Sequence, residues 1–256
     1  MLTSSPPVEV ALRLGDTCLV LAQRLGEWCG HAPVLEEDIA LANIALDLLG
    51  HARGLLTRAG ELEGTGRDED DLAYLREAAE FRNVALAELP NGDFGKTILR
   101  QFFYDAYAVP LWSELASSTD PGLAGIAAKA VKESTYHLRH SGGWVVRLGD
   151  GTEESHARMQ SSLDLLLPYT RELFTDDEVD ATAAAAGVAP LPSSLRVRWR
   201  GTVETVLGEG GLRVNPDVLD QPAPGLGGRQ GVHTEHLSQL LAEMQVVHRA
   251  HPGAAW

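Results

Sequence analysis

The residues best suited to chemistry lie in one stretch of the chain, 126–148 (IAAKAVKESTYHLRHSGGWVVRL). Within it, Glu133, His137, His140 and Trp144 follow one another at steps of four, three and four residues. Such steps place all four side chains on one face of a helix. A carboxylate and two imidazoles on one helix face suit a metal-binding bundle, and they suit a buried hydrogen-bond network equally well. The two alternatives differ in the further ligands that they require.

A di-iron site of the ferritin-like kind requires a specific ligand pattern. Two helices each supply one Glu, and two others each supply Glu-x-x-His. Of the nine histidines in the chain, only His156 has an acid three residues before it, Glu153. That pair follows Gly149-Asp150-Gly151, at an expected helix start and far from the middle of a bundle. The chain therefore lacks the two core pairs that a di-iron site needs.

Carboxylates and histidines also occur at the neighbouring spacing of four residues. Asp47 precedes His51, Glu133 precedes His137, and Asp105 lies in the apolar stripe of another expected helix. Buried charges are stable only when they are paired. We therefore interpret these five residues as a vestigial polar network in the core, with no catalytic residue and no metal ligand in this chain. The alternative that stays open is a metal-dependent oxygenase in its own right, with an atypical carboxylate and histidine site.

The elements that position these residues are almost all helices. Apolar residues recur at helical spacing, capping and turn residues separate the segments, and strand signals are nearly absent. A Gly- and Pro-rich, irregular region is expected at 208–231. The pattern predicts an all-α protein with long antiparallel helices. The expected helices span about 8–29, 33–60, 71–89, 94–117, 121–149, 153–173, 175–187, 193–207 and 234–249.

Composition and charge narrow the class of protein. A hydrophobic content of 44% over 256 residues is typical of a soluble globular protein. The net charge of −15 argues against a nucleic-acid or anionic membrane surface. Cys18 and Cys29 lie about 16 Å apart along one expected helix, too far to form a disulfide. Together with the lack of a recognisable leader or long apolar run, this predicts a cytoplasmic protein.

Five blocks of the sequence resemble one family, the C subunit of bacterial ring-1,2-phenylacetyl-CoA epoxidase, and the resemblance covers nearly the whole chain. The blocks are RLGDTCLVLAQRLGEWCGHAP (13–33), DIALANIALDLLGHAR (38–53), ELPNGDFGKTILRQFF (88–103), AKAVKESTYHLRHSGGW (128–144) and GVHTEHLSQLLAEMQ (231–245).

This resemblance implies a fold and a function. The fold would be a ferritin-like antiparallel helical bundle with extra C-terminal helices. It would form a single domain over 1–256, with the core bundle at about 8–175 and a C-terminal extension at about 176–256. The chain would be a non-catalytic structural subunit that pairs with and stabilises a catalytic A subunit. The complex inserts one atom of dioxygen into the ring of phenylacetyl-CoA, in aerobic phenylacetate degradation.

The resemblance also implies where cofactors and ligands lie. This chain would bind no cofactor, because di-iron belongs to the A subunit, and NADPH, FAD and iron–sulfur belong to a reductase subunit. Its partners would be the A subunit and other subunits, with phenylacetyl-CoA near the interface, and neither nucleic acid nor membrane. Glu80, Phe81, Arg82 and Asn83 are the candidate contact with the CoA ester or the partner. Phe81 and Asn83 match the family's pattern and Arg82 departs from it. The alternative is a solvated helix face.

Overall fold

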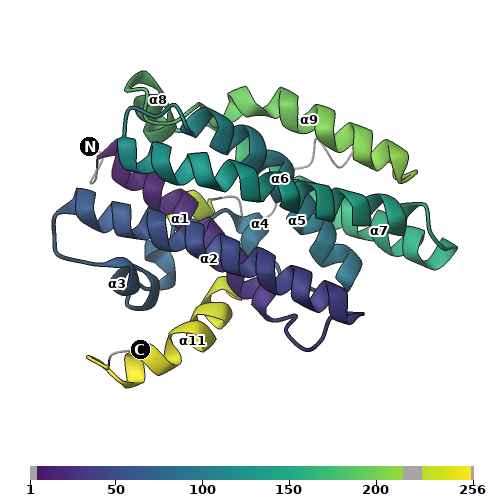
Figure 1. The fold of residues 1–256 in the computed structure, drawn as a ribbon, viewed down its shortest axis with the longest axis horizontal. Coiled ribbons are helices and arrows are strands. Elements are labelled where there is room, and N and C mark those ends of the chain that lie inside the picture. The colour runs from purple at the N-terminus through teal and green to yellow at the C-terminus, as the bar shows by residue number, and fades with distance from the viewer. Residues whose placement is uncertain (1–4, 216–226, 255–256) are drawn as a thin grey trace. The chain divides into compact units, whose positions relative to one another are not determined.

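The computed structural model describes residues 5–215 and 227–254, and within them every regular element is a helix (Figure 1). The chain divides into two compact units. Unit 1 comprises Met1–Pro90 with Gly225–Trp256, and unit 2 comprises Asn91–Pro224. Part of the expected irregular region, 216–226, lies outside the described residues.

A pair of long helices forms the centre of unit 1. Helix α1 (Pro6–Gly26) begins with prolines in its first turn, where a missing N–H costs nothing. Helix α2 (Leu35–Glu63) begins with three acids and ends at Gly64, which caps it in the left-handed conformation. The two helices pack along each other, and the short connection between them makes the pair antiparallel. By length and composition α2 could cross a membrane, a test that core helices of soluble proteins also pass.

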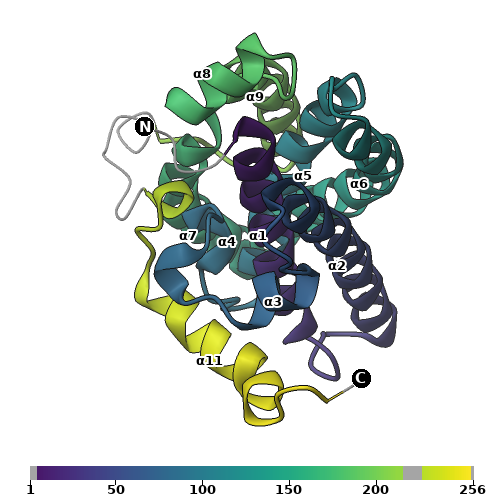
Figure 2. The ribbon, with the colours of Figure 1, turned by 90° about the vertical axis from the view of Figure 1, so that its left-hand side faces the viewer.

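The rest of unit 1 differs from the single helix expected over 71–89. That prediction is wrong, because the segment is divided into α3 (Glu69–Tyr74), a short 3-10 turn η1 (Ala78–Glu80) and α4 (Ala85–Glu88). After η3 (Gly228–Gln230), the C-terminal helix α11 (Glu235–Ala250) packs against α3 and η1. Figure 2 shows α11 beside α3, although about 160 residues separate them along the chain.

Unit 2 is built around a second antiparallel pair, α5 (Phe94–Leu115) and α6 (Pro121–Gly149). Asp93 and Asp120 cap the two helices, since each carboxylate accepts a backbone N–H of the first turn. The remaining elements of unit 2 are α7 (Glu153–Leu166), η2 (Leu167–Phe174), α8 (Glu178–Ala185) and α9 (Pro192–Glu209).

The grouping of helices does not follow the expected boundary near residue 175. Helices α8 and α9 lie in unit 2 with α5 and α6, whereas α11 returns to unit 1. The expected C-terminal extension is therefore shared between the units. That both units make up a single domain stays a prediction.

Candidate functional site

The buried face of α6 lies beside the stripe that the sequence singled out. Ser134, His137 and Ser141 are buried, at helical steps of three and four. Of the four residues that the sequence placed on one face, Glu133, His137, His140 and Trp144, only His137 belongs to this buried line. Glu133 is half-buried, and its carboxylate lies 3.4 Å from the Lys129 ammonium.

His140 and Trp144, the other two members of the stripe, are half-buried. The indole of Trp144 packs edge-on against Phe94, with ring centroids 5.2 Å apart. The stripe thus follows the margin of the buried face of α6. The polar side chains that point into unit 2 from this helix are those of the buried line, Ser134, His137 and Ser141.

Asp105 of α5 meets that buried line. Its side chain is 1% exposed, Oδ1 accepts a hydrogen bond from Gln101 Nε2 at 2.7 Å, and Oδ2 lies 2.7 Å from Ser141 Oγ. Burial raises the pKa of Asp105 to about 7, and the hydrogen bonds of Ser141 and Gln101 oppose that rise. Ser141 Oγ also lies 3.0 Å from the His137 carbonyl oxygen. Ser141 donates to Asp105 while the carboxylate is ionised. Because a hydroxyl has one proton, a protonated Asp105 instead donates to Ser141, which then donates to the carbonyl.

The five residues of the expected core network are divided between the units. Asp47 and His51 lie on α2 in unit 1, whereas Asp105, Glu133 and His137 lie in unit 2. His51, Asp105 and His137 are buried. Asp105 reaches the backbone of His137 through the α6 serine hydroxyl. A network that joins all five stays a prediction.

The ligand set of a di-iron centre does not fit these residues. The buried line of α6 offers Ser134, His137 and Ser141, so only one of its side chains is of a type that iron binds in such centres. The Glu153 and His156 pair lies at the start of α7, and His156 Nδ1 is 2.6 Å from the Gly149 carbonyl oxygen. Over residues 5–215 and 227–254, no group of three or more His, Cys, Asp or Glu side chains is placed to hold a metal ion.

The candidate contact at 80–83 is largely internal. Phe81 and Asn83 are fully buried, so a solvated helix face is wrong for these two residues, which also lie outside any helix. Glu80 is exposed, and Arg82 is half-buried with Nη1 donating to two nearby backbone carbonyls at 2.8 Å. A contact of this block with a CoA ester stays a prediction, and here only Glu80 and Arg82 have side chains that could make it directly.

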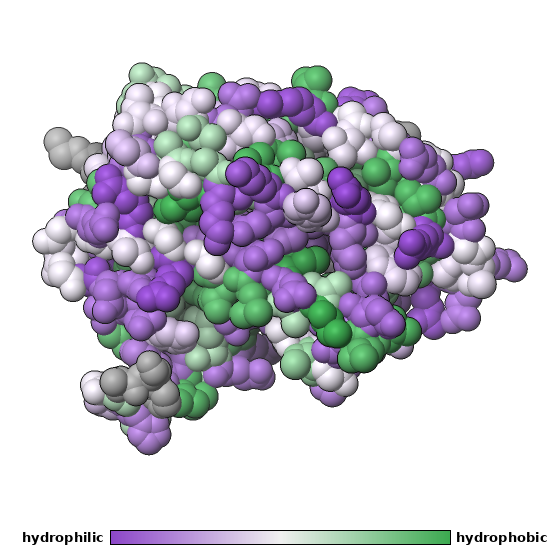
Figure 3. Space-filling view, in the orientation of Figure 1, coloured by the Kyte–Doolittle hydropathy of each residue, from purple (hydrophilic) through white to green (hydrophobic). Residues whose placement is uncertain are grey.

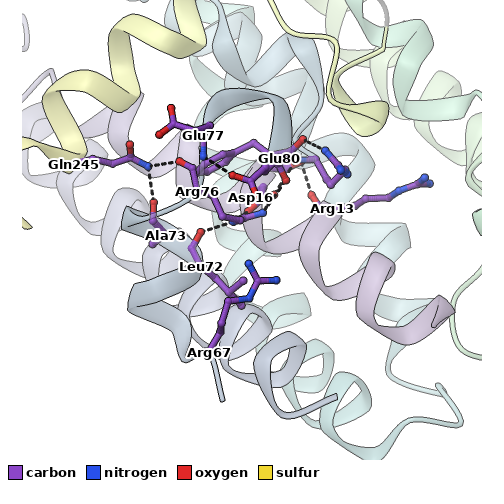
Figure 4. Close-up of polar contacts among 12 residues, drawn as sticks. Arg13, Asp16, Arg67, Leu72, Ala73, Arg76, Glu77, Glu80 and Gln245 are labelled. Carbon is purple, nitrogen blue, oxygen red and sulfur yellow. Dashed lines mark hydrogen bonds and ion pairs between the residues drawn. The ribbon is translucent and has the colours of Figure 1, made fainter. Parts of the chain in front are cut away.

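A buried ion pair beside this block was missed by the sequence reasoning (Figure 4). Arg76 is 4% exposed and both of its terminal nitrogens bond the carboxylate of Asp16, which is fully buried. The same carboxylate accepts the backbone N–H of Arg82 at 2.8 Å. The Arg76 guanidinium also lies 4.3 Å from the centre of the Phe81 ring. These contacts explain why a helix over 71–89 is broken, because Asp16 takes an N–H that a continuous helix would use internally.

The ion pair is joined to the C-terminal helix. Gln245 of α11 is buried, and its Nε2 donates to the backbone carbonyls of Ala73 and Arg76 at 3.0 and 3.1 Å (Figure 4). The exposed Arg249 also donates, from Nη2, to the same Arg76 carbonyl at 3.0 Å. The carbonyls at the end of α3 therefore receive donors from a helix far along the sequence.

A second buried carboxylate, Glu88, anchors the segment before α11. Its side chain is fully buried and accepts Asn83 Nδ2 at 2.9 Å, Thr234 N at 2.7 Å and Thr234 Oγ1 at 2.6 Å. His233 Nδ1 lies 2.5 Å from the same carboxylate. The backbone carbonyl of Glu88 accepts two hydrogen bonds from Arg24 of α1. The signal that could have indicated this cluster is one acid within the apolar run ALAELP (85–90).

Comparisons with known proteins place the chain in a family. The family model described as "Phenylacetic acid catabolic protein" matches residues 2–256. A curated relative, the C subunit of the 1,2-phenylacetyl-CoA epoxidase of Escherichia coli (strain K12), is 52% identical over 245 residues, which are 96% of this chain and 97% of that protein.

Among solved structures, Protein 19 with aldehyde deformylating oxidase activity from Synechococcus matches 81% of this chain and 88% of its own. The TM-score is 0.52 and the sequence identity is 17%, so this likeness concerns the fold alone. It confirms the predicted fold class, an all-α, ferritin-like helical bundle with extra C-terminal helices.

Proposed function

This chain belongs to the family of phenylacetic acid catabolic proteins, and we propose that it is the structural subunit of a multicomponent phenylacetyl-CoA 1,2-epoxidase. In this proposal the chain is not itself catalytic. It pairs with the A subunit, which holds the di-iron centre, and stabilises it. Reducing equivalents reach that centre from a reductase subunit with NADPH, FAD and iron–sulfur. The support is the 52% identity to a protein named as the C subunit of such an epoxidase.

The observation that carries the non-catalytic role is the environment of Asp105. A carboxylate that binds iron must be ionised and must offer its oxygens to the metal. Asp105 is fully buried, and each of its oxygens is hydrogen-bonded to a neutral side chain of the same unit, Gln101 or Ser141, and not turned toward a ligand set shared among the described residues. Between the long helices of unit 2 the chain therefore places a closed hydrogen-bond chain, which favours a structural role.

The proposal includes a cytoplasmic location. Cys18 and Cys29 are both free thiols, as expected for a reducing compartment. Helix α2, although apolar, carries a buried face that packs along α1, which is typical of a core helix in a soluble protein.

Co-expression with the A subunit of the same epoxidase tests the proposal. We expect the two chains to co-elute, and iron to be near stoichiometric in the A subunit and absent from this chain purified alone. Elution as separate species would contradict the pairing. Stoichiometric iron in the lone chain, lost on Glu133→Gln or His137→Ala, would instead favour an oxygenase in its own right.

A further inference from the structure

The solvent side of α2 is unusually apolar. Leu35, Ile39, Ala42, Leu46 and Leu49 follow one another at steps of four, three, four and three residues. The four large side chains are 72%, 54%, 64% and 40% exposed, in that order. We call these five residues the outer stripe. Apolar atoms are visible over the N-terminal end of α2 in Figure 3.

The outer stripe is separate from the face that α2 uses inside unit 1. The inner face is buried and carries Leu41, Ile44, Leu48 and Leu55. A helix that covers a core needs only one apolar face, and its other face is normally polar. A second apolar stripe on the same helix indicates a partner, because exposed apolar patches usually mark interaction sites.

The spacing of the outer stripe indicates what kind of element it binds. Steps of four and three residues are those of a heptad seam, in which apolar side chains of one helix pack between those of another. From Leu35 to Leu49 the stripe is about 21 Å long, or about four helical turns. It therefore fits an amphipathic helix of similar length.

The end of the outer stripe opens into a groove that adds a charge preference. The groove has a volume of about 300 Å³, and Leu49 is one of its walls. Its lining within unit 1 includes apolar side chains and two acids. Leu19, Leu56, Asp70 and Tyr74 are part of this lining, together with Glu69 and Arg53, whose Nε lies 3.1 Å from the Glu69 carboxylate.

The groove has an apolar lining, and its charged residues are Asp70 and the Arg53–Glu69 ion pair. Leu19 and Leu56 are buried, so the lining can take the aliphatic part of a side chain. A backbone hydrogen bond, with hydrogen bonds of Arg53 and Thr57, lowers the pKa of Glu69, so it is ionised at neutral pH. Burial, and after it the charge of Asp70, raises the pKa of Tyr74. The charge of Asp70 therefore favours a cation at this end of the stripe, whereas Glu69 is already paired with Arg53.

We propose that the outer stripe docks an amphipathic helix of a partner chain, with apolar residues at heptad spacing and a Lys or Arg that enters the groove. The aliphatic stem of that residue would lie on Leu19 and Leu56, and its cation would meet Asp70, beside the Arg53–Glu69 pair. This inference rests on the proposed function, in which the partner is the A subunit. The net charge of −15 disfavours a second copy of this chain as the occupant.

The experiment measures the affinity of the purified chain for the A subunit. We expect Leu46→Arg to weaken binding by about tenfold or more, as for a central apolar contact. The matched control is Val197→Arg, which changes an 81% exposed apolar residue of α9 in unit 2 and should change the affinity less than about twofold. Circular dichroism of each variant checks that the helices are retained.

A charge variant tests the groove. Asp70→Asn should weaken binding severalfold and flatten its dependence on salt, whereas Glu243→Gln, an exposed acid of α11, should change neither. If the wild-type chain binds the A subunit and Leu46→Arg binds equally well, this inference is wrong and the proposed function stands. If the wild-type chain does not bind at all, the proposed function fails. A dimer of the lone chain that Leu46→Arg dissociates would show that a second copy is the occupant and overturn the inference.

Discussion

A single carboxyl group, Asp105, links the sequence pattern to the chemistry of unit 2. It lies in the apolar stripe of α5, where a charged group has no water, and its neighbours are an amide and a hydroxyl. Neither neighbour is a cation, so desolvation has the largest effect on its pKa. The result is an acid whose protonated and ionised forms coexist near neutral pH.

The raised pKa of Asp105 makes the stability of the chain depend on pH. In the folded chain its pKa is about 7, whereas an unfolded Asp has a pKa of about 3.9. Between these values the folded state binds more protons than the unfolded state, so stability is full below about pH 4 and falls as pH rises through 7. The loss by pH 8 is at most roughly 4 kcal/mol.

Asp105→Asn should therefore remove this part of the pH dependence. An Asn amide can accept from Gln101 and donate to Ser141, which keeps the geometry without a charge. Urea unfolding at pH 5, 6, 7 and 8 would measure the effect. We expect the stability of the variant relative to the wild type to rise with pH. Parallel pH profiles for the two proteins would show that Asp105 is ionised throughout.

Glu88 differs from Asp105, because its buried carboxylate accepts hydrogen bonds from Asn83 and from both the backbone N–H and the hydroxyl of Thr234. Glu88→Gln replaces one acceptor oxygen by a donor that faces Thr234 or His233. Since a buried donor without an acceptor is costly, we expect a loss of about 3 kcal/mol in the free energy of unfolding. Thermal unfolding measures it. Glu235→Gln, an exposed acid two residues after His233, is the control and should cost less than about 0.5 kcal/mol.

At the scale of elements, the segment from α3 to α4 shows tertiary contacts overriding helix propensity. EAAEFRN (77–83) has good helix formers, yet its backbone leaves the helix after α3. The Asp16–Arg76 pair and the caps of η1 satisfy the backbone groups that the break frees. Helix α11 then covers this segment, so the last described helix belongs to the packing of the first ninety residues.

The approach of the C-terminal segment to this region depends on one glycine. Gly231 has φ +82°, and a Cβ there would lie 2.3 Å from the carbonyl oxygen of Ala79. Gly231→Ala should therefore destabilise the chain by about 2 kcal/mol or more, through backbone strain and the clash. Gly253→Ala is the matched control, because it has φ +79° with open space around it and adds only the strain. Equal unfolding midpoints for the two variants would contradict the close approach.

Helix α2 shows that two apolar faces can serve different purposes. Its inner face is buried in this chain, and the outer stripe is exposed. In the sequence, the inner face and the outer stripe cannot be told apart, because the apolar residues of each recur at helical spacing. Only the packing of α1 against one side distinguishes a core face from a surface that we propose to bind a partner.

At the scale of the whole molecule, the chain leaves unit 1 once and returns to it. Residues up to Pro90 and those from Gly225 belong together, and unit 2 is inserted between them. Each unit has one long antiparallel helix pair, α1 with α2 and α5 with α6. The polar residues that looked like a single constellation in the sequence are therefore distributed over two separately packed cores.

The net charge of the molecule gives a prediction for assembly. With a charge of −15, a complementary partner surface should be attracted over a distance comparable to the Debye length. Raising the salt concentration from about 50 to about 500 mM should therefore slow association with the A subunit and change its dissociation rate much less. Stopped-flow or biosensor kinetics would measure both rates. An association rate that does not respond to salt would argue for a purely apolar interface.

Several properties of this protein follow from the sequence alone. Helical periodicity and local caps predicted α1, α2, α5 and α6 to within a few residues, because hydrogen bonds between near neighbours and single side-chain caps define such elements. The lack of paired Glu-x-x-His motifs is likewise a property of spacing along the chain. Similarity over the five sequence blocks indicated the family that the comparisons then showed.

The tertiary structure decided the features that depend on residues far apart in the chain. Asp16 with Arg76, and Glu88 with Thr234, are separated by 60 and 146 residues, and no local pattern pairs them. The raised pKa of Asp105 and the exposure of the outer stripe depend on which side chains exclude water from each position. Desolvation and long-range pairing arise only when distant segments pack together, which is why the spacing of residues along the chain could not predict them.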